Sequence, residues 1–78
     1  MEMYEIKDGT IIYNDIVMKK SKEFEFENVE YVQFLNNQEH KYIVMKKISE
    51  NLCIKIVDKE LIKKIIDENF KKATDIIE

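Results

Sequence analysis

The polarity of the side chains follows a period of two along most of the first 57 residues, and a longer period after them. Alternation of apolar and polar positions is typical of a β-strand that buries one face, because successive side chains point to opposite sides. The pattern predicts strands over residues 3–7, 10–13, 16–20, 41–48 and 52–57. The fourth of these is apolar on both faces, which favours a central position in a sheet.

Short polar stretches between the strands predict how the chain reverses. Asp8-Gly9 is typical of a two-residue hairpin turn, since both of its central positions need a positive φ. Asn14-Asp15 is a weaker signal of the same kind. Residues 19–22 and 36–40 are polar, and they predict a connection and a loop. Turns this short join neighbouring antiparallel strands, so we expect an antiparallel sheet.

The segment at residues 23–35, EFEFENVEYVQFL, changes its phase in the middle. Phe24 and Phe26 share one face and acids occupy the other, but an unbroken strand would bring Glu30 onto the phenylalanine face. A charge on an apolar face without a partner is costly. We therefore expect a β-bulge or tight corner at Glu27-Asn28, which leaves an acidic comb on one side of a bent strand. The comb consists of Glu23, Glu25, Glu27 and Glu30.

From Asp58 the apolar positions recur with a period of 3.6 residues and predict one amphipathic helix over about residues 58–77. Asp58 is the expected N-cap, because its carboxylate can accept hydrogen bonds from the free amides of the first turn. The apolar stripe comprises Leu61, Ile62, Ile65, Ile66, Phe70, Ala73, Ile76 and Ile77. This stripe would cover one face of the sheet, or would form a surface for a second copy or a partner helix.

Strands within residues 3–57, followed by a terminal helix, predict a single α+β domain over residues 1–78. We expect an antiparallel, strongly bent sheet or small open barrel of about five to seven short strands, followed by one C-terminal amphipathic helix. In such a fold the helix closes one face or end of the sheet. The order of elements resembles that of pleckstrin-homology-like domains, and it also fits unrelated small folds with a sheet and one helix.

Composition narrows the classes of partner. The chain has 78 residues, a net charge of −3 and 37% charged side chains, and all of its 13 basic residues are lysine. A net negative charge and the lack of arginine argue against general binding to nucleic-acid phosphates. The sequence shows no run of 18 apolar residues and no signal-peptide pattern, and Cys53 alone cannot form an intramolecular disulfide. These features favour a cytoplasmic protein without a membrane span.

The sequence lacks the residue patterns that usually carry catalysis or hold a cofactor. His40 lies in the expected loop, and no second histidine or nearby cysteine gives it the spacing of a metal site. Cys53 is flanked by Leu52 and Ile54 in an expected strand, and no local base would turn it into a thiolate. Gly9 is the only glycine, so neither a glycine-rich phosphate loop nor a Gly-x-Ser-x-Gly elbow can occur. We therefore expect no enzyme activity, no metal and no cofactor.

These exclusions favour a small non-enzymatic module that binds another protein through its surface. Phage and mobile elements often encode compact inhibitors of this kind, including inhibitors of nuclease-type host defence. In that role the acidic comb would meet a basic patch and displace nucleic acid from it. A simpler interpretation of the comb is that glutamates on a strand deter edge-to-edge pairing.

Two other functions remain open. A pleckstrin-homology-like ligand or headgroup-binding domain would use a basic patch, for which Lys19, Lys20 and Lys22 are the candidates. A structural subunit would instead self-associate, for example as a homodimer through the helix or an edge strand. A small enzyme or nucleotide-binding domain ranks last.

Overall fold

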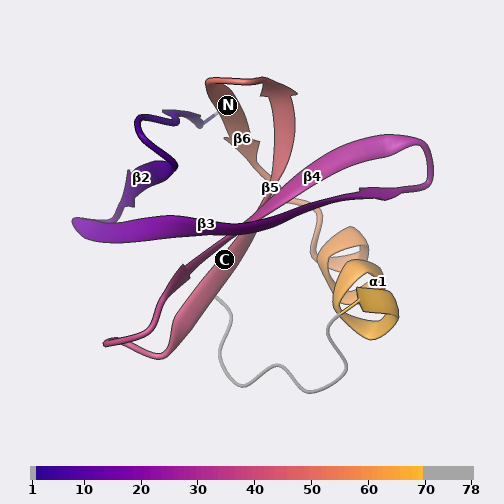
Figure 1. The fold of residues 1–78 in the computed structure, drawn as a ribbon. Coiled ribbons are helices and arrows are strands. Elements are labelled where there is room, and N and C mark those ends of the chain that lie inside the picture. Colours follow the sequence, from indigo (N-terminus) through magenta and orange to yellow (C-terminus); the bar gives the residue numbers. More distant parts are fainter. Residues whose placement is uncertain (1, 70–78) are drawn as a thin grey trace.

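Each range in which the alternation predicts a strand contains one, although with different bounds, and Figure 1 shows the strands wound into one strongly curved sheet. The computed structural model describes residues 2–69. Within these residues the sheet has six antiparallel strands in the spatial order β1-β6-β5-β4-β3-β2. Their bounds are β1 Met3–Glu5, β2 Thr10–Tyr13, β3 Ile16–Phe26, β4 Val29–Asn36, β5 Lys41–Ser49 and β6 Leu52–Lys55, and the helix α1 spans Lys59–Asn69.

The two outermost strands, β1 and β2, nearly close the sheet into a barrel. The predicted Asp8-Gly9 turn joins them, with φ angles of 52° and 75° at its two residues. The backbone groups of Lys7 and Thr10 exchange two hydrogen bonds across this turn, each 2.9 Å long. This bridge is isolated, so in the described residues a seam remains between β1 and β2. The expected α+β fold, a small open barrel followed by a C-terminal helix, is confirmed.

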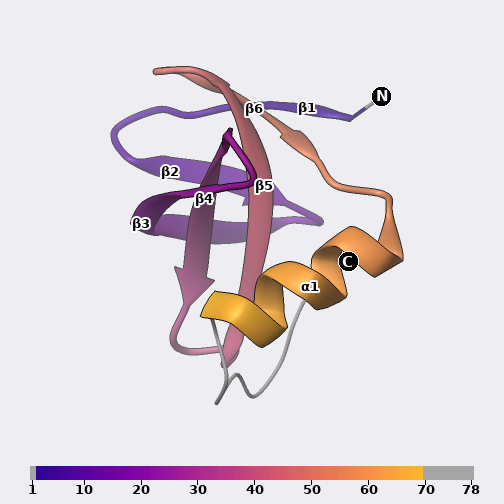
Figure 2. The same cartoon turned by 90° about the vertical axis from the view of Figure 1, so that its right-hand side faces the viewer.

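Two apolar cores lie on opposite faces of β4 and β5. The inner core, inside the barrel, comprises Ile11, Tyr13, Met18, Val32, Phe34, Ile43, Met45 and Cys53. The helix-side core, between the outer face of the sheet and α1, comprises Tyr31, Tyr42, Val44, Ile56, Ile62 and Ile65 (Figure 2). Because β4 and β5 serve both cores, residues 31–34 and 42–45 are all buried. The predicted central position of the strand at 41–48 is therefore confirmed.

The helix α1 begins after the predicted N-cap. The Asp58 carboxylate accepts hydrogen bonds from the backbone amides of Glu60 and Leu61, at 3.0 and 3.2 Å. Ile62 and Ile65 point into the helix-side core, as the apolar stripe predicts. The rest of the predicted helix lies outside the described residues, including Phe70, Ala73, Ile76 and Ile77. No helix within residues 2–69 has the length and apolar character that a membrane crossing requires.

The connection predicted at residues 19–22 is wrong, because β3 runs through it without a break. The polar run reflects a strand with both faces in solvent at this point, since residues 19–23 are all exposed. A β-bulge at Ser21 shifts the register with β4 by one residue. The bulge inverts the alternation, so Met18 before it faces the inner core, whereas Phe24 and Phe26 after it pack on the helix-side core.

The bend predicted at Glu27-Asn28 is a complete reversal of the chain. Both residues have positive φ, 51° and 66°, and form the two-residue turn of a β3–β4 hairpin. Residues 23–35 are therefore two antiparallel strands and not one bent strand. Phe24 stacks on Tyr31 across this hairpin, with ring centroids 5.7 Å apart. The reversal escaped the sequence pattern because glutamate rarely adopts positive φ, so Glu-Asn is a poor hairpin signal.

Candidate functional site

The hairpin between β3 and β4 places two glutamates directly opposite each other. Phe26 and Val29 flank the two-residue turn and form a hydrogen-bonded pair, so the next pair, Glu25 and Glu30, is of the non-hydrogen-bonded kind. The Cα atoms of such a pair are only about 4.5 Å apart, and its side chains lie close together. We call Glu25 and Glu30 the acidic pair.

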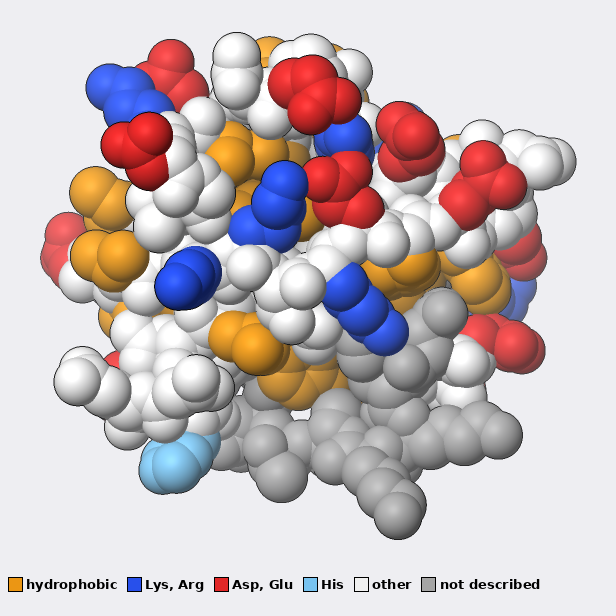
Figure 3. Space-filling model, viewed as in Figure 1, with side chains coloured by type: hydrophobic (Ala, Val, Ile, Leu, Met, Phe, Trp, Pro, Cys, Tyr) orange, Lys and Arg blue, Asp and Glu red, His pale blue; other side chains and the backbone are white. Residues whose placement is uncertain are grey.

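The acidic pair is exposed, and within residues 2–69 neither carboxylate is bound by a lysine. Figure 3 shows acidic side chains gathered at the upper right of this face, where Figure 1 places the end of the hairpin. Like charges directly opposite each other destabilise an antiparallel ladder. The pair is therefore a local concentration of negative charge that the described part of the chain leaves uncompensated.

Glu23 differs from the acidic pair because two lysines already bind it. Lys47 Nζ lies 2.6 Å from one carboxylate oxygen, and Lys20 Nζ lies 2.9 Å from the other. Lys47 also contacts Glu50 at 3.2 Å. The hydrogen bond from Lys47, followed by that from Lys20, lowers the pKa of Glu23, and the bond to Glu23 raises the pKa of Lys47. Glu23 therefore fixes the hairpin to β5 and has little capacity left for a partner.

Glu27 also leaves the predicted comb, because it lies in the turn itself. Burial raises the pKa of the Tyr31 phenol, and the negative charge of Glu27 raises it further. Tyr31 faces the helix side of the sheet, so this charge lies near a different face from Glu25 and Glu30. The structure thus brings together two of the four predicted acids, Glu25 and Glu30. The sequence pattern did not indicate that Lys47, which lies 24 residues from Glu23 in sequence, would bind Glu23.

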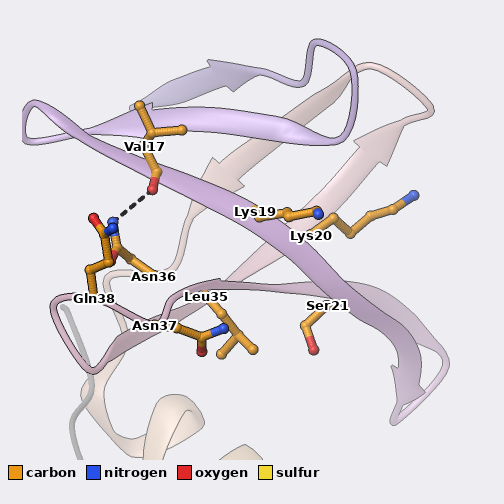
Figure 4. A pocket seen from close by; sticks show the side chains of 8 residues that line it. All are labelled: Val17, Lys19, Lys20, Ser21, Leu35, Asn36, Asn37 and Gln38. Atoms are coloured by element: carbon orange, nitrogen blue, oxygen red, sulfur yellow. Dashed lines mark hydrogen bonds between the residues drawn. The ribbon is translucent and has the colours of Figure 1, made fainter.

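The predicted basic patch is divided in a similar way. Lys19 and Lys20 line an open cleft of about 470 Å³ between β3 and the turn after β4, opposite Asn37 and Gln38 (Figure 4). The side chain of Lys20 extends away from those amides, toward Glu23. Lys22 does not line the cleft; its ammonium group lies 5.7 Å from the ring centroid of Phe24.

The wall of this cleft is fixed by the side chain of Asn36. Its amide nitrogen donates to the Val17 carbonyl at 3.0 Å, and its amide oxygen accepts from the Glu39 backbone at 2.8 Å. These bonds hold the turn after β4 against β3. The cleft could therefore hold a small anionic ligand against Lys19, with hydrogen bonds from the turn.

The residues considered for catalysis are far from a catalytic arrangement. Cys53 is fully buried in the inner core, with its Sγ 3.4 Å from the sulfur of Met45. Burial raises the pKa of the Cys53 thiol to about 11, so it stays protonated at neutral pH. His40 is an exposed turn residue with a φ of 54°. Over residues 2–69, no three His, Cys, Asp or Glu side chains are grouped closely enough to bind a metal ion.

Comparison of the chain with protein-family models, with curated proteins and with solved structures finds no match. A functional assignment must therefore come from the surface itself.

Proposed function

We propose that the protein is a non-enzymatic binding module that contacts a basic surface of another protein through the acidic pair. The observation that carries this proposal is the direct opposition of Glu25 and Glu30 in the β3–β4 ladder, both exposed. A lysine or arginine from a partner, placed between the two carboxylates, would relieve their repulsion and form charge-assisted hydrogen bonds. The fixed position of the hairpin supports this role, because Glu23 and Lys47 tie it to β5.

A narrower form of the proposal concerns the kind of basic surface. Carboxylates compete with phosphates for the same lysine and arginine side chains, so an acidic face suits a surface that binds nucleic acid. The protein would then act as an inhibitor, of the kind that phage and mobile elements use against nuclease-type host defence. Competition with nucleic acid is the property that separates this form from simple adaptor binding.

Charge reversal at the acidic pair tests the proposal. In the variant E25K/E30K the two opposed residues again carry like charges, so folding should resemble that of the wild type. The control E39K/E68K makes the same change of net charge at two exposed positions elsewhere. Affinity capture from the source cell and mass spectrometry should identify a protein that the wild type and the control retain. Its recovery should fall at least tenfold with E25K/E30K.

Equal recovery of every captured protein by all three baits would refute the proposal. With the partner purified, its affinity should weaken steeply as salt rises from 50 to about 500 mM, because the contact is electrostatic. Duplex DNA or RNA added as a competitor then tests the narrower form. An inhibitor of a nuclease should be displaced by nucleic acid, whereas an adaptor that binds elsewhere on the partner should stay bound.

One observation supports a second candidate function, the pleckstrin-homology-like binding of an anionic headgroup. The cleft beside Lys19 and Lys20 has a volume of about 470 Å³, and its lining includes the apolar residues Val17 and Leu35. Titration with inositol 1,4,5-trisphosphate, followed by amide NMR shifts, tests this alternative. Saturable shifts confined to the cleft and lost in K19E/K20E would support it, and their absence at millimolar ligand would exclude it.

A further inference from the structure

Among residues 2–69, no strand neighbours the outer edge of β3 over its second half. β2 pairs only with residues 16–19 of β3, and the amide of Lys20 makes one further bond, to the Gly9 carbonyl at 2.7 Å. Within the described part of the chain, residues 22–26 pair with β4 on one side, and no strand is paired with them on the other. An unpaired edge of this kind can accept a strand from another chain.

The phase of the β3–β4 ladder determines which backbone groups point outward. The pairs Phe26–Val29 and Phe24–Tyr31 bond across the ladder, so the amides and carbonyls of Glu23 and Glu25 point away from β4. The hairpin at Asp8-Gly9, which has the same two-residue turn, shows this bonding in both directions between its flanking residues. The edge therefore offers two amides and two carbonyls to an incoming strand.

We propose that the partner binds by β-strand addition, laying an extended segment of alternating basic and apolar residues along residues 22–26 of β3. This inference rests on the proposed function and names the chemistry of its partner. A residue paired with Glu25 would lie about 5 Å from it and beside the uncompensated charge of Glu30, which selects lysine or arginine there. Residues on the other face would meet Phe24 and Phe26, which are half-buried against the helix-side core, and this selects apolar side chains.

Charge also disfavours a second copy of this chain as the occupant. Two copies paired edge to edge along residues 22–26 would bring the glutamates of one strand beside those of the other. Like charges directly opposite each other disfavour such a pair. The same glutamates that disfavour self-pairing therefore favour a basic partner strand. Glutamates on this strand edge can thus both deter edge-to-edge pairing and recognise a basic partner.

A synthetic peptide of seven alternating lysine and valine residues, capped at both ends, serves as the probe. A second peptide with the same composition, but with its lysines and valines in two blocks, is the matched control. The alternating peptide should slow hydrogen exchange at the Glu23 and Glu25 amides at least tenfold. The Phe24 amide, which bonds to β4, should change little. The block peptide should produce less than a tenth of this protection.

Backbone N-methylation separates strand addition from charge attraction, because it removes a hydrogen-bond donor and keeps the carboxylate. The chain can be assembled by ligation at Cys53, which allows N-methylglutamate at position 25. We expect the dissociation constant of the alternating peptide to rise at least tenfold in this variant. N-methylation at Ile12, which is exposed on the outer edge of β2, is the matched control and should change it less than twofold.

The possible results distinguish this inference from the proposed function. If both peptides bind equally and N-methylation at Glu25 changes nothing, strand addition is wrong, while charge-driven binding through the acidic pair stands. Failure of the alternating peptide to bind also overturns strand addition. If the free protein is a dimer with its Glu23 and Glu25 amides already protected, the occupant is a second copy and the inference is wrong. If N-methylation at Glu25 unfolds the chain, hydrogen exchange of the unmodified protein with the two peptides still shows whether the alternating peptide adds a strand to β3.

Discussion

Replacing Glu25 with lysine should make the protein more stable, which is unusual for a substitution at a proposed binding site. In the wild type Glu25 lies directly opposite Glu30, and both are exposed. The substitution converts a pair of like charges into a pair of opposite charges. It also places a lysine on the same face as Glu23, two residues earlier on β3.

The ladder geometry sets the size of the effect. A cross-strand pair of opposite charges stabilises by roughly 0.2–1 kcal/mol, and a like pair destabilises by a similar amount. Replacing the like pair by an opposite pair should therefore raise the free energy of unfolding by about 0.4–2 kcal/mol, and solvent exposure favours the lower half of this range. For a domain of this size, 1 kcal/mol raises Tm by about 4–8 °C. We expect Tm to increase by about 2–8 °C in dilute buffer.

A double-mutant cycle measures this interaction without assuming the effect of either single substitution. E25K and E30K should each raise the free energy of unfolding in urea, whereas E25K/E30K should return it close to the wild-type value. The resulting non-additivity should be about 1–2 kcal/mol. It should shrink strongly in 1 M NaCl, where the screening length is only about 3 Å. E39K serves as the control and should change stability by less than about 0.5 kcal/mol.

Additive effects, or a stability gain that is insensitive to salt, would show that Glu25 and Glu30 do not face each other as described. The proposed function would then lose its main observation. If E25K is more stable than the wild type but no longer binds the partner, the repulsion between Glu25 and Glu30 serves binding at the expense of stability.

Three further predictions test the fold. Burial raises the pKa of Cys53 to about 11, so the unfolded chain loses the thiol proton first as the pH rises above 9. The free energy of unfolding should therefore fall by about 2–3 kcal/mol between pH 9 and 11, and urea titrations should show a smaller fall in C53A. D58A should lower stability by about 1 kcal/mol in thermal circular dichroism, while D58N keeps most of it, because Asp58 caps two amides of α1. Deleting Ser21 removes the extra residue of the bulge but keeps the pairs on both sides of it, Lys20–Phe34 and Lys22–Gln33, so Phe24 and Phe26 should stay on the helix-side core. Because half-burial of each ring stabilises by about 0.8–1.5 kcal/mol, the deletion should cost less than the roughly 1.5–3 kcal/mol that exposing both rings would cost, and S21A should stay within about 0.5 kcal/mol of the wild type in urea.

The elements that the sequence determines are those set by local physics. Alternating side chains produce strands in any sheet, a period of 3.6 produces an amphipathic helix, and a carboxylate at Asp58 caps its first turn. The Asp8-Gly9 turn was equally predictable, because few residues tolerate two positive φ angles in succession. Strand β5 could be placed at the centre of the sheet because apolar residues occupy both of its faces.

The candidate surface depended on pairings between residues that the sequence does not link. The bulge at Ser21 decides which face Phe24 occupies, and a shift of one residue reverses every side chain beyond it. The ion pair between Glu23 and Lys47 removes one acid from the predicted comb.

Local pattern specifies which side chains can share a face, because that depends only on the dihedral angles of neighbouring residues. The tertiary structure alone decides which strands become neighbours, which charges are neutralised and which edge stays open. These outcomes depend on the register between strands and on the packing of two cores against one sheet, and many registers satisfy the same alternation. The glutamates of residues 23–30 were therefore visible in the sequence, but only the fold leaves Glu25 and Glu30 opposed and uncompensated beside a free edge.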